Sequence, residues 1–377
     1  MSLQNKSKNK KVAVALSGGV DSSVAAALLK KQGFDVIGFH LRFWKAKENK
    51  SKNKEVEDRV KKIGEVLAIP IKFFDVKENF KKLVEDYFLK EMKNGRTPNT
   101  CVVCNREIKF KFLLAKAKEL NCDYLATGHY ARIKHYQLQI LDGEQSRTTT
   151  NYKLLRAKDL NKDQTYFLWG LKLTPQQWSK ILFPIGEIEN KQKVRQIAKV
   201  FGLPTFQTPS SSDVCFLGSL DFNSFLQKKL GKKKGNIVDK QGNILGEHQG
   251  LWFYTIGQRK GINIPVKKGK TGLPWFVVGK NTKKNTLIVS QNEKDLLKKE
   301  LIAEQVNWIS GIEIKLPLQV LAKVRYGAVP SIAIIKEKTG QKKYKVIFAK
   351  PQKAITPGQS IVFYLKNELL AGGVIQF

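Results

Sequence analysis

The feature that most constrains this sequence is an apolar segment that runs directly into a glycine- and serine-rich loop and then into a helix. Residues 12–16 are all apolar, residues 17–23 read Ser-Gly-Gly-Val-Asp-Ser-Ser, and residues 24–31 have helical composition. An uninterrupted apolar run is typical of a strand covered on both faces, as in a parallel sheet. The segment therefore predicts a strand–loop–helix unit that opens an α/β domain.

The next hundred residues continue the alternation of strands and helices. Strands are predicted at residues 35–43, 71–74 and 124–127, and helices at 55–67, 80–89 and 106–120. This order predicts a doubly wound parallel sheet. Ligands bind such sheets at the carboxyl ends of strands, where Gly128 and His129 follow the last of these segments.

The second half of the chain has a different pattern. Helices are predicted at residues 163–171, 191–201 and 222–230, and glycines separate short segments from residue 235 onward. Residues 285–377 alternate β-branched and polar side chains, with strand-like runs at 286–289, 318–324, 343–348 and 360–364, which predicts a small β-barrel or sandwich. A length of 377 residues fits several domains. We predict an α/β domain at 1–210, a small central linking domain at 211–280 and a carboxyl-terminal β-barrel at 281–377.

Charge indicates the kind of partner. The chain has 68 Lys and Arg against 32 Asp and Glu, a formal net charge of +36. Such a field attracts polyanions, so we expect a nucleic-acid partner. Lysine clusters at 228–229, 232–234 and 267–268 are scattered, which indicates a broad phosphate-binding surface. A lysine-rich composition without any binding role is the alternative.

Targeting signals and cysteines indicate the compartment. No stretch reaches the roughly 18 apolar residues of a membrane span, and residues 1–11 lack the apolar core of a secretory signal. We expect a cytoplasmic protein without a membrane partner. Four cysteines are too few for a disulfide scaffold at this length. Cys122, beside a predicted strand, is expected to be a buried apolar residue.

The loop at residues 17–23 suits an anion. Its glycines allow close backbone approach, and its N–H groups, the following helix and the hydroxyls of Ser17, Ser22 and Ser23 can all contact phosphate oxygens. It lacks the Gly-Lys-Ser/Thr ending of a kinase-type loop and the G-x-G-x-x-G spacing of a dinucleotide fold. It resembles the S-G-G-x-D-S loop of the ATP pyrophosphatase (PP-loop) superfamily, whose members adenylate a carbonyl oxygen and release pyrophosphate.

The remaining cysteines are candidates for chemistry. Cys101 and Cys104 form a C-x-x-C pair, which could be half of a zinc site, but no second pair completes it because Cys122 and Cys215 stand alone. Cys215 lies in a polar stretch, which suits an accessible, reactive thiol.

Eight ordered blocks together resemble the tRNA-specific 2-thiouridylase (MnmA) family nearly end to end. They lie at residues 17–22, 97–99 with 104–105 and 108–110, 126–130, 162–164 with 166–168, 215–216, 246–250, 255–261 and 356–359. The resemblance implies a tRNA-uridine 2-sulfurtransferase with ATP and Mg²⁺. The enzyme adenylates O2 of the wobble uridine of tRNA and then transfers sulfur from a cysteine persulfide, giving 2-thiouridine, AMP and pyrophosphate.

The resemblance also implies roles for single residues and partners. Cys104 is the expected nucleophile and Cys215 the persulfide carrier, and a disulfide between the two is expected at the end of the reaction. The expected partners are the anticodon loops of tRNAs for Lys, Glu and Gln, and a persulfide donor protein or cysteine desulfurase. The expected ATP contacts are Ala15, Leu16, Ser17, Gly18, Gly19, Val20, Asp21, Ser22, Leu41 and Gly128. The expected contacts to the target base and the tRNA are Asn99, Thr100, Cys101, His129, Lys162, Asp163, Gln164, Arg325, Tyr326 and Gln359.

One departure from the family pattern matters. Many members have Pro-Asn-Pro-Asp where this chain has Pro98-Asn99-Thr100-Cys101, so an aspartate beside the target uridine is absent. Cys101, Cys104 and Cys215 could instead hold a [4Fe-4S] cluster with one open iron.

Two other functions stay open at the level of sequence. Another PP-loop tRNA-modifying or amide-forming enzyme would not need paired thiols. A non-catalytic RNA-binding protein with a relic loop is disfavoured by the intact Asp21 and Ser22.

Overall fold

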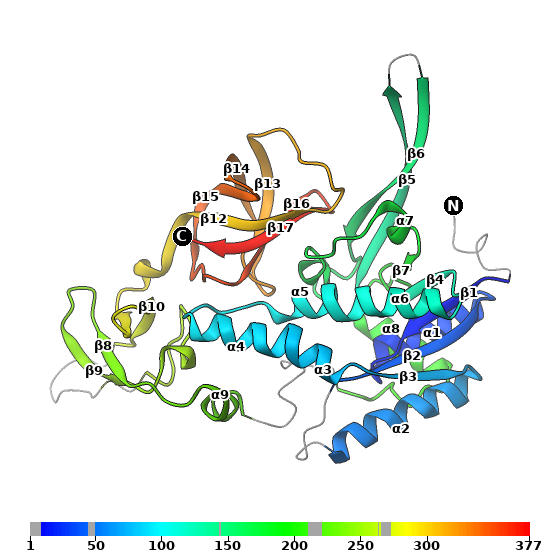
Figure 1. Ribbon diagram of the computed structural model, residues 1–377, viewed down its shortest axis with the longest axis horizontal. Helices are drawn as coiled ribbons and strands as arrows, with labels where there is room; N and C mark the ends of the chain where they lie inside the picture. Colours follow the sequence, from blue (N-terminus) through cyan, green and yellow to red (C-terminus); the bar gives the residue numbers. More distant parts are fainter. Residues whose placement is uncertain (1–8, 44–49, 143–144, 210–220, 263, 265–272) are drawn as a thin grey trace.

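Three β-sheets organise the chain. The computed structural model describes residues 9–43, 50–142, 145–209, 221–262, 264 and 273–377 (Figure 1). Its sheets have five, four and eight strands. No helix within these described ranges is both long and apolar enough to cross a membrane.

The five-stranded sheet is parallel and has the order β3-β2-β1-β4-β7. The strands are β1 (Lys11–Ala15), β2 (Asp35–Arg42), β3 (Ile71–Asp75), β4 (Tyr124–Thr127) and β7 (Ile181–Leu182). Ala13 in the central strand pairs with Ile37 on one side and Leu125 on the other. The middle three residues of β1 are fully buried, as its apolar run predicts.

Helices cover both faces of this sheet, which confirms the doubly wound prediction. Alternate β1 residues point to opposite faces: Val12 and Val14 pack in the cluster of α1 (Val20–Lys31), α2 (Lys50–Leu67) and α8 (Lys191–Val200). Ala13 packs in the other cluster, with two long helices. The first is formed by α3 (Lys77–Phe80), the π-helical η3 (Lys81–Glu85) and α4 (Asp86–Lys93), and the second by α5 (Thr100–Cys104), the π-helical η4 (Asn105–Phe110) and α6 (Lys111–Glu119).

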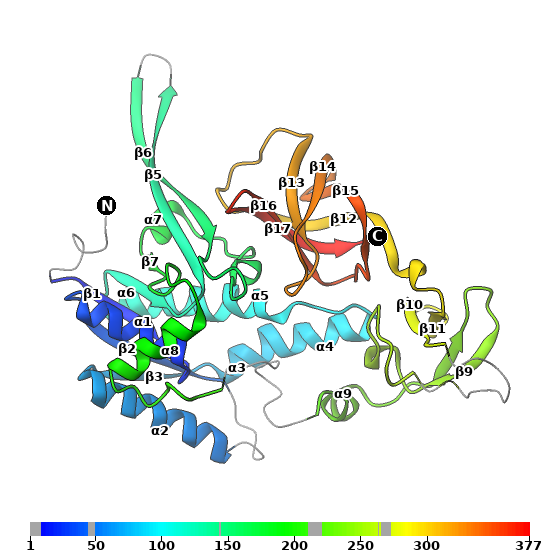
Figure 2. The same ribbon diagram turned by 180° about the vertical axis from the view of Figure 1, so that it is seen from behind.

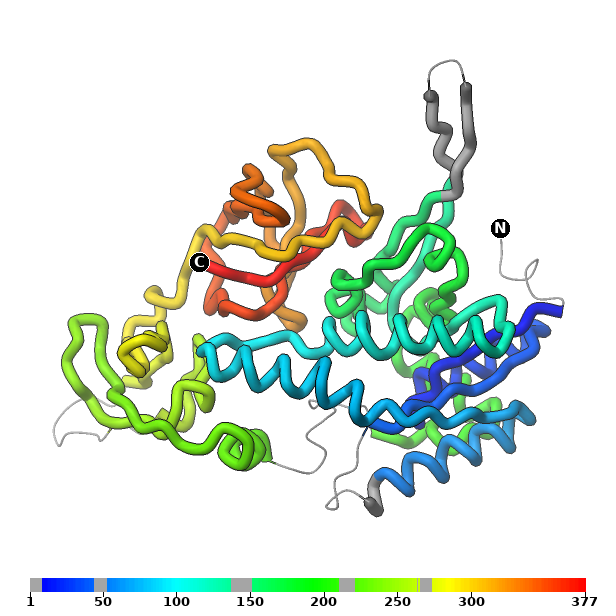
Figure 3. Tube along the Cα trace, viewed as in Figure 1, coloured from blue at the N-terminus to red at the C-terminus, as the bar shows by residue number. Residues whose placement is uncertain are grey.

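These two long helices extend beyond the predicted ranges of 80–89 and 106–120. The second begins at Thr100, so the C-x-x-C pair lies on its first turns. The tube in Figure 3 shows both helices running from the parallel sheet toward the other end of the molecule. The second of these helices contains Cys104 and places it away from the sheet and toward the barrel.

The segment after β4 differs most from the prediction. A long antiparallel hairpin, β5 (Ala131–Asp142) and β6 (Gln145–Arg156), was not predicted. The predicted helix at 163–171 is wrong, since the structure has only the 3₁₀ turn η5 (Thr165–Phe167) there. The carboxylate of Asp163 accepts hydrogen bonds from the backbone N–H groups of Ala157 and Thr165, and this local bonding competes with a helix. The short helix α7 (Pro175–Trp178) follows.

The central part contains the predicted helix α9 (Phe222–Leu230) and a four-stranded sheet of order β10-β11-β8-β9. Its elements are β8 (Gly235–Val238), β9 (Ile244–His248), the 3₁₀ turn η6 (Leu251–Phe253), β10 (Phe276–Asn281) and β11 (Thr286–Ser290). Strand β11, which we expected in the barrel, pairs with β8 through Leu287 and Ile237 instead. The domain limits 1–210, 211–280 and 281–377 stay a prediction.

The carboxyl-terminal part is a closed six-stranded antiparallel barrel, as predicted. After the 3₁₀ turn η7 (Glu293–Leu296) the strands are β12 (Leu297–Trp308), β13 (Leu318–Lys323), β14 (Ser331–Gly340), β15 (Lys343–Lys353), β16 (Ser360–Leu365) and β17 (Glu368–Gln376). Pairing of β12 with β17 closes the ring, which removes exposed strand edges. Strand β17 also pairs with β6 through Glu368 and Leu155, so the hairpin joins the barrel sheet (Figure 2).

Hydrogen bonds fix the barrel to the α/β part. Asn307 donates its side-chain amide to the carbonyl oxygens of Trp169 (2.7 Å) and Leu171 (2.9 Å). The indole of Trp169 donates to Ser360 Oγ at 2.9 Å. Gly372 of β17 faces the same indole. The interface between the barrel and the α/β part is therefore held by directed hydrogen bonds as well as by apolar contacts.

We expect Gly372→Ala to destabilise this interface. An added Cβ would lie 2.4 Å from Cγ of Trp169, closer than any van der Waals contact. Overpacking of this kind costs about 1–3 kcal/mol, so the denaturant midpoint should fall. Gly327→Ala, where a Cβ meets nothing within 4 Å, is the matched control and should leave the midpoint unchanged. Equal midpoints for both variants would contradict the close packing.

Candidate nucleotide and thiol site

The glycine–serine loop lies at the carboxyl end of β1 and leads into α1. Gly18 has a φ of +79°, which favours glycine, and a Cβ there would lie 3.0 Å from Val56 of α2. The loop is closed by its own hydroxyls: Ser17 N donates to Ser22 Oγ at 3.1 Å, and Ser22 Oγ donates to the carbonyl oxygen of Gly19 at 3.1 Å. No side chain caps α1 at Gly19. The amino end of this helix therefore presents N–H groups to an anion.

Gly128 closes one side of the loop. A Cβ on Gly128 would lie 2.6 Å from the backbone nitrogen of Ser22 and 2.8 Å from the carbonyl carbon of Asp21. Only glycine allows the end of β4 to approach the start of α1 this closely. The structure thus brings Gly128 and the loop together, as the predicted ATP contacts require, although their role in binding ATP stays a prediction.

Asp21 is held by two donors from other elements. Its Oδ1 accepts a hydrogen bond from the Tyr130 hydroxyl at 2.7 Å and lies 2.5 Å from the amine of Lys191. Burial, and next the charge of Asp21, raises the pKa of Tyr130, so the phenol stays protonated and donates. The sequence had indicated Asp21 but neither Lys191 nor this use of Tyr130.

Beyond the residue that pairs with the end of β1, strand β2 continues with two buried residues. Leu41, a predicted ATP contact, is buried at the end of β2. Its neighbour His40 is also buried, and its Nδ1 lies 2.8 Å from the carbonyl oxygen of Leu16. Burial lowers the pKa of His40, so the ring is neutral, and a proton on Nδ1 ties the end of β1 to β2.

A second group of predicted residues gathers where the α/β part meets the barrel. Asn99 donates its side-chain amide to Ser360 Oγ at 3.1 Å. Gln359 donates to the carbonyl oxygen of Thr97 at 3.1 Å, and Thr97 N donates to the carbonyl oxygen of Pro357 at 2.9 Å. Asn99 and Gln359, two predicted tRNA contacts far apart in the sequence, thus lie together. We call the joined segments 97–99 and 356–360 the wall.

Cys104 lies just beside this wall. Cys101 is exposed and Cys104 is buried, and since they are three residues apart on α5 they share one face of the helix. Cys104 stands where α5 passes into π-helical η4, a geometry often found at functional sites. Asn105 donates its side-chain amide to the carbonyl oxygen of Phe167 at 3.0 Å, which fixes this junction against the η5 turn.

The predictions for the other two cysteines, Cys122 and Cys215, have different outcomes. Cys122 is buried, as predicted, and burial raises its pKa. Cys215 lies outside the described residues. No disulfide joins the three cysteines that the structure describes.

His129 connects the two groups. Its ring contacts Phe110 of η4 (5.7 Å between ring centroids) and Phe183 (6.3 Å), and its Nδ1 lies 2.8 Å from Thr127 Oγ1. Burial, followed by the charge of Lys109, lowers the pKa of His129 to about 3. The imidazole is therefore neutral at physiological pH and can exchange hydrogen bonds but carries no charge.

The remaining predicted RNA contacts differ in their burial and in their hydrogen-bond partners. Asp163 is buried, and its carboxylate accepts hydrogen bonds from Arg156, Ala157 and Thr165, so it orders the turn. Gln164 accepts a hydrogen bond from Tyr130 N at 3.0 Å.

Of the other predicted RNA contacts, Lys162 is half-buried. Tyr326 stacks on Phe167 with ring centroids 4.6 Å apart, whereas Arg325 is exposed and donates to the carbonyl oxygen of Lys353. Direct RNA contact by any of them stays a prediction.

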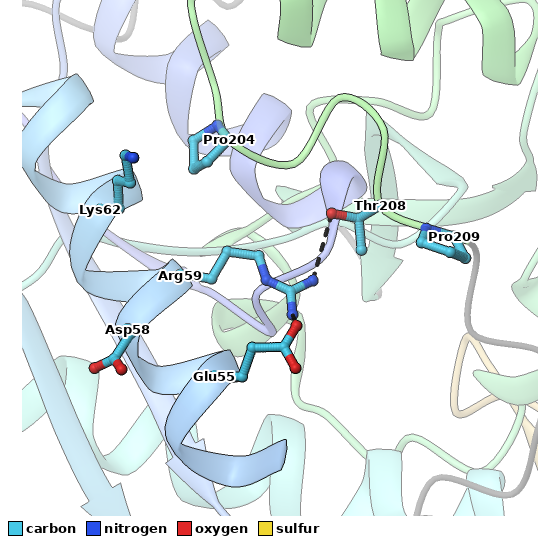
Figure 4. A pocket seen from close by; sticks show the side chains of 7 residues that line it. All are labelled: Glu55, Asp58, Arg59, Lys62, Pro204, Thr208 and Pro209. Carbon is cyan, nitrogen blue, oxygen red and sulfur yellow. Dashed lines mark hydrogen bonds and ion pairs between the residues drawn. The ribbon is translucent and has the colours of Figure 1, made fainter. Parts of the chain in front are cut away.

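A shallow pocket lies behind the loop, between α2 and residues 204–209 (Figure 4). Arg59 pairs with Glu55 on the same helix (2.8 Å) and reaches across the pocket to the hydroxyl of Thr208 (3.4 Å). Arg195 of α8 donates to the carbonyl oxygen of Thr208 at 2.8 Å. Thr205 shares a hydrogen bond of 2.6 Å with Ser23 of α1. Together these contacts fasten the chain just before residues 210–220 to the helices around the loop.

The fold and the loop define a class. A parallel sheet whose first strand ends in Ser-Gly-Gly-Val-Asp-Ser, with Asp21 at the amino end of the next helix, is that of a PP-loop nucleotide-binding enzyme. Three family models cover the chain: a "tRNA methyl transferase HUP domain" at residues 10–219, a "tRNA methyl transferase PRC-barrel domain" at 223–291 and an "Aminomethyltransferase beta-barrel domain" at 298–375.

Full-length relatives specify the family. A tRNA-specific 2-thiouridylase MnmA of Clostridioides difficile is 42% identical over 98% of this chain and 98% of its own length. One of Buchnera aphidicola is 42% identical over 98% and 97%, and one of Halalkalibacterium halodurans 43% over 97% and 94%. The chain belongs to the tRNA-specific 2-thiouridylase family.

Similarity to solved structures is lower. The U34-tRNA thiolase NcsA of Methanococcus maripaludis, solved with its [4Fe-4S] cluster, aligns with a TM-score of 0.35 at 22% identity, over 59% of this chain and 67% of that one.

We expect Gly128→Ala to weaken nucleotide binding. The new methyl group must displace the backbone of Asp21 and Ser22, so the amino end of α1 moves away from its phosphate-binding position. Calorimetry with Mg·ATP should show a loss of affinity of about tenfold or more, the equivalent of one charge-assisted hydrogen bond. Gly340→Ala, whose nearest contact would be 3.5 Å, is the control. Unchanged ATP affinity in a folded Gly128→Ala variant would contradict this placement.

The neutral state of His129 has a measurable signature. Its ring signal in NMR should not titrate between pH 8 and 5, whereas an exposed histidine titrates near pH 6.5. Because the unfolded imidazole binds a proton first, the contribution of His129 to stability is complete above pH 6.5 and is lost as pH falls toward about 3. His129→Gln assigns the signal and should reduce this acid sensitivity. Titration of the assigned signal near pH 6.5 would contradict a neutral ring packed between Phe110 and Phe183.

Proposed function

We propose that this protein is an ATP-dependent tRNA-uridine 2-sulfurtransferase that acts on the wobble uridine of tRNA. The observation that carries the proposal is the placement of Cys104 on the helix that leads from the two-domain wall of Asn99 and Gln359 to His129 and the nucleotide loop. A thiol, the wall that contains two of the predicted tRNA contacts, and the glycine–serine loop are thus parts of one connected arrangement, which supports this proposal. Family membership supports the same reaction.

In the first step, O2 of the uridine attacks the α-phosphorus of ATP. The new O–P bond forms as the bond to the β-phosphate oxygen breaks, and pyrophosphate leaves. N–H groups at the start of α1 and the hydroxyls of Ser17 and Ser22 stabilise the charge on the phosphates. Mg²⁺ fits this site because it binds through one or two carboxylates together with substrate phosphates, and Asp21 offers such a carboxylate.

In the second step, sulfur replaces the activated oxygen. The terminal sulfur of a persulfide on Cys215 attacks C2, and AMP leaves with the former O2. The Cys104 thiolate attacks Sγ of Cys215 and breaks the S–S bond, which leaves the sulfur on the base and a disulfide between the cysteines. A thiol reductant then restores both thiols. Neutral His129 can hydrogen-bond the uridine without adding charge.

An iron–sulfur cluster is a separate hypothesis. Thiolates are the correct donors, and Cys101 and Cys104 share a helix face, but the third candidate, Cys215, is not among the described residues. Those residues contain no group of three metal-binding side chains. We therefore derive no step through a cluster. Iron and sulfide analysis after anaerobic purification tests it, and full activity of an iron-free protein would exclude it.

The proposal extends to partners. The net charge of +36 supports binding of a polyanion such as tRNA. The proposed substrates are the tRNAs for Lys, Glu and Gln, and sulfur would come from a persulfide donor protein or a cysteine desulfurase in the cytoplasm. Another PP-loop enzyme, amide-forming or tRNA-modifying, is the alternative.

The test is direct conversion of tRNA. Purified protein, unmodified tRNA for Lys, ATP, Mg²⁺ and a sulfide source should yield 2-thiouridine, detected by mass after digestion of the RNA. Asp21→Ala should abolish both pyrophosphate release and thiolation, because it removes the carboxylate at the loop. Cys104→Ser should abolish thiolation, and Cys122→Ser is the matched thiol control that should retain it. Pyrophosphate release on another acceptor without thiolated tRNA would favour the alternative.

A further inference from the structure

The glycine–serine loop contains no cation of its own. A kinase-type loop carries a lysine within its motif that contacts the β- and γ-phosphates, but residues 17–23 have only glycine, valine, serine and Asp21. A reaction that expels pyrophosphate builds negative charge on the leaving group, and fixed positive charge there lowers the barrier. A side-chain cation that acts beside the metal ion would therefore have to come from another element.

Lys191 is positioned to supply it. It is the first residue of α8, and its amine lies 2.5 Å from Asp21 Oδ1. Its side chain is only 15% exposed, whereas that of Asp21 is 33% exposed. The amine also lies 5.6 Å from the centre of the Tyr130 ring. A largely buried ammonium is thus fixed at the amino end of α1, where the helix favours an anion.

Neighbouring contacts keep α8 in place. Asn190 caps the helix by accepting a hydrogen bond from Lys193 N at 2.9 Å. Val194 and Ala198 of α8 pack in the same buried cluster as Val24 and Ala27 of α1. The position of Lys191 therefore depends on a rigid helix pair and not on a flexible side chain alone.

Asp21 does not depend on Lys191 alone. The Tyr130 hydroxyl donates to the same Oδ1 at 2.7 Å, and Tyr130 is itself held by Gln164 through Tyr130 N. If the amine leaves, the carboxylate keeps one donor and its orientation. The ion pair can therefore exchange partners without collapse of the loop.

We propose that Lys191 is the phosphate-binding cation of this loop and contacts the pyrophosphate portion of ATP. In the structure its charge is paired with Asp21. When ATP enters with its metal ion, the amine exchanges the carboxylate for β- and γ-phosphate oxygens, and Asp21 becomes available to the metal. This inference deepens the proposed function and rests on it, because it assigns a role in the same ATP-dependent step.

Lys193 offers a matched control on the same helix. Its amine pairs with Glu189 one turn away, and both side chains are more than half exposed. Lys191→Met and Lys193→Met remove the same charge two residues apart, so the net charge of the protein changes equally. Only Lys191→Met changes the charge at the loop.

The experiment measures binding of Mg·ATP, AMP and pyrophosphate to the full-length protein by calorimetry without RNA. Lys191→Met should weaken binding of ATP and of pyrophosphate by about tenfold or more, as expected for loss of one charge-assisted contact. AMP, which lacks the pyrophosphate portion, should lose far less. Lys191→Arg should recover part of the affinity, and Lys193→Met should match the wild type.

A double-variant comparison separates phosphate binding from a merely structural ion pair. In EDTA, Asp21→Asn frees the amine and should strengthen pyrophosphate binding, whereas Asp21→Asn combined with Lys191→Met should not. An equal gain in both would overturn the inference, as would ATP affinity in Lys191→Met equal to that in Lys193→Met. Equal loss of ATP and AMP binding would also overturn it, because that result means general damage to the site. A wild-type protein that binds no ATP overturns the proposed function itself.

Discussion

The buried carboxylate of Asp163 organises the region on which the rest of the site depends. A charge removed from water is tolerated only when hydrogen bonds and an opposite charge compensate it. Here Arg156 supplies the charge, and Ala157 and Thr165 supply the donors. The turn fixed in this way presents Gln164 to Tyr130 on one side and Tyr166 to Ser360 on the other. One internal ion pair thus sets the position of the nucleotide loop relative to the barrel.

Much of the fold could be predicted because its signals are local. The apolar run of β1, the Ser-Gly-Gly loop and the alternating barrel strands depend on spacing within a few residues. The helix predicted at 163–171 failed for the opposite reason, since partners outside the segment fix the turn: Asp163 bonds Arg156, and Gln164 N donates to the carbonyl oxygen of Tyr130. The β5–β6 hairpin was missed although Tyr136, Leu138 and Ile140 alternate with polar residues in β5, because the polar, threonine-rich start of β6 has no such alternation. The placement of β11 depends on pairing with β8, some 50 residues earlier in the chain, and no local pattern reports it.

Most residues of the candidate site could be predicted from the sequence, but the contacts between them could not. Gly128, Asp21, Cys104 and Gln359 were named from motifs, and the structure explains the glycine by its approach to Ser22. Lys191 carried no signal, because a lysine at the start of a helix in a lysine-rich chain is unexceptional. The role proposed for Lys191 follows only from the approach of α8 to α1 in the structure. The partner of Cys104 in the proposed chemistry, Cys215, lies outside the described residues.

The contact between residues 97–99 and 356–360 joins segments that are about 260 residues apart in the chain. During synthesis on the ribosome the glycine–serine loop emerges early, whereas this wall is complete only after residues 356–360 have emerged. A chain interrupted before residue 356 retains the loop but lacks the groups that hold Asn99 and Thr97. Assembly of this wall is therefore coupled to synthesis of the barrel, whereas assembly of the glycine–serine loop is not.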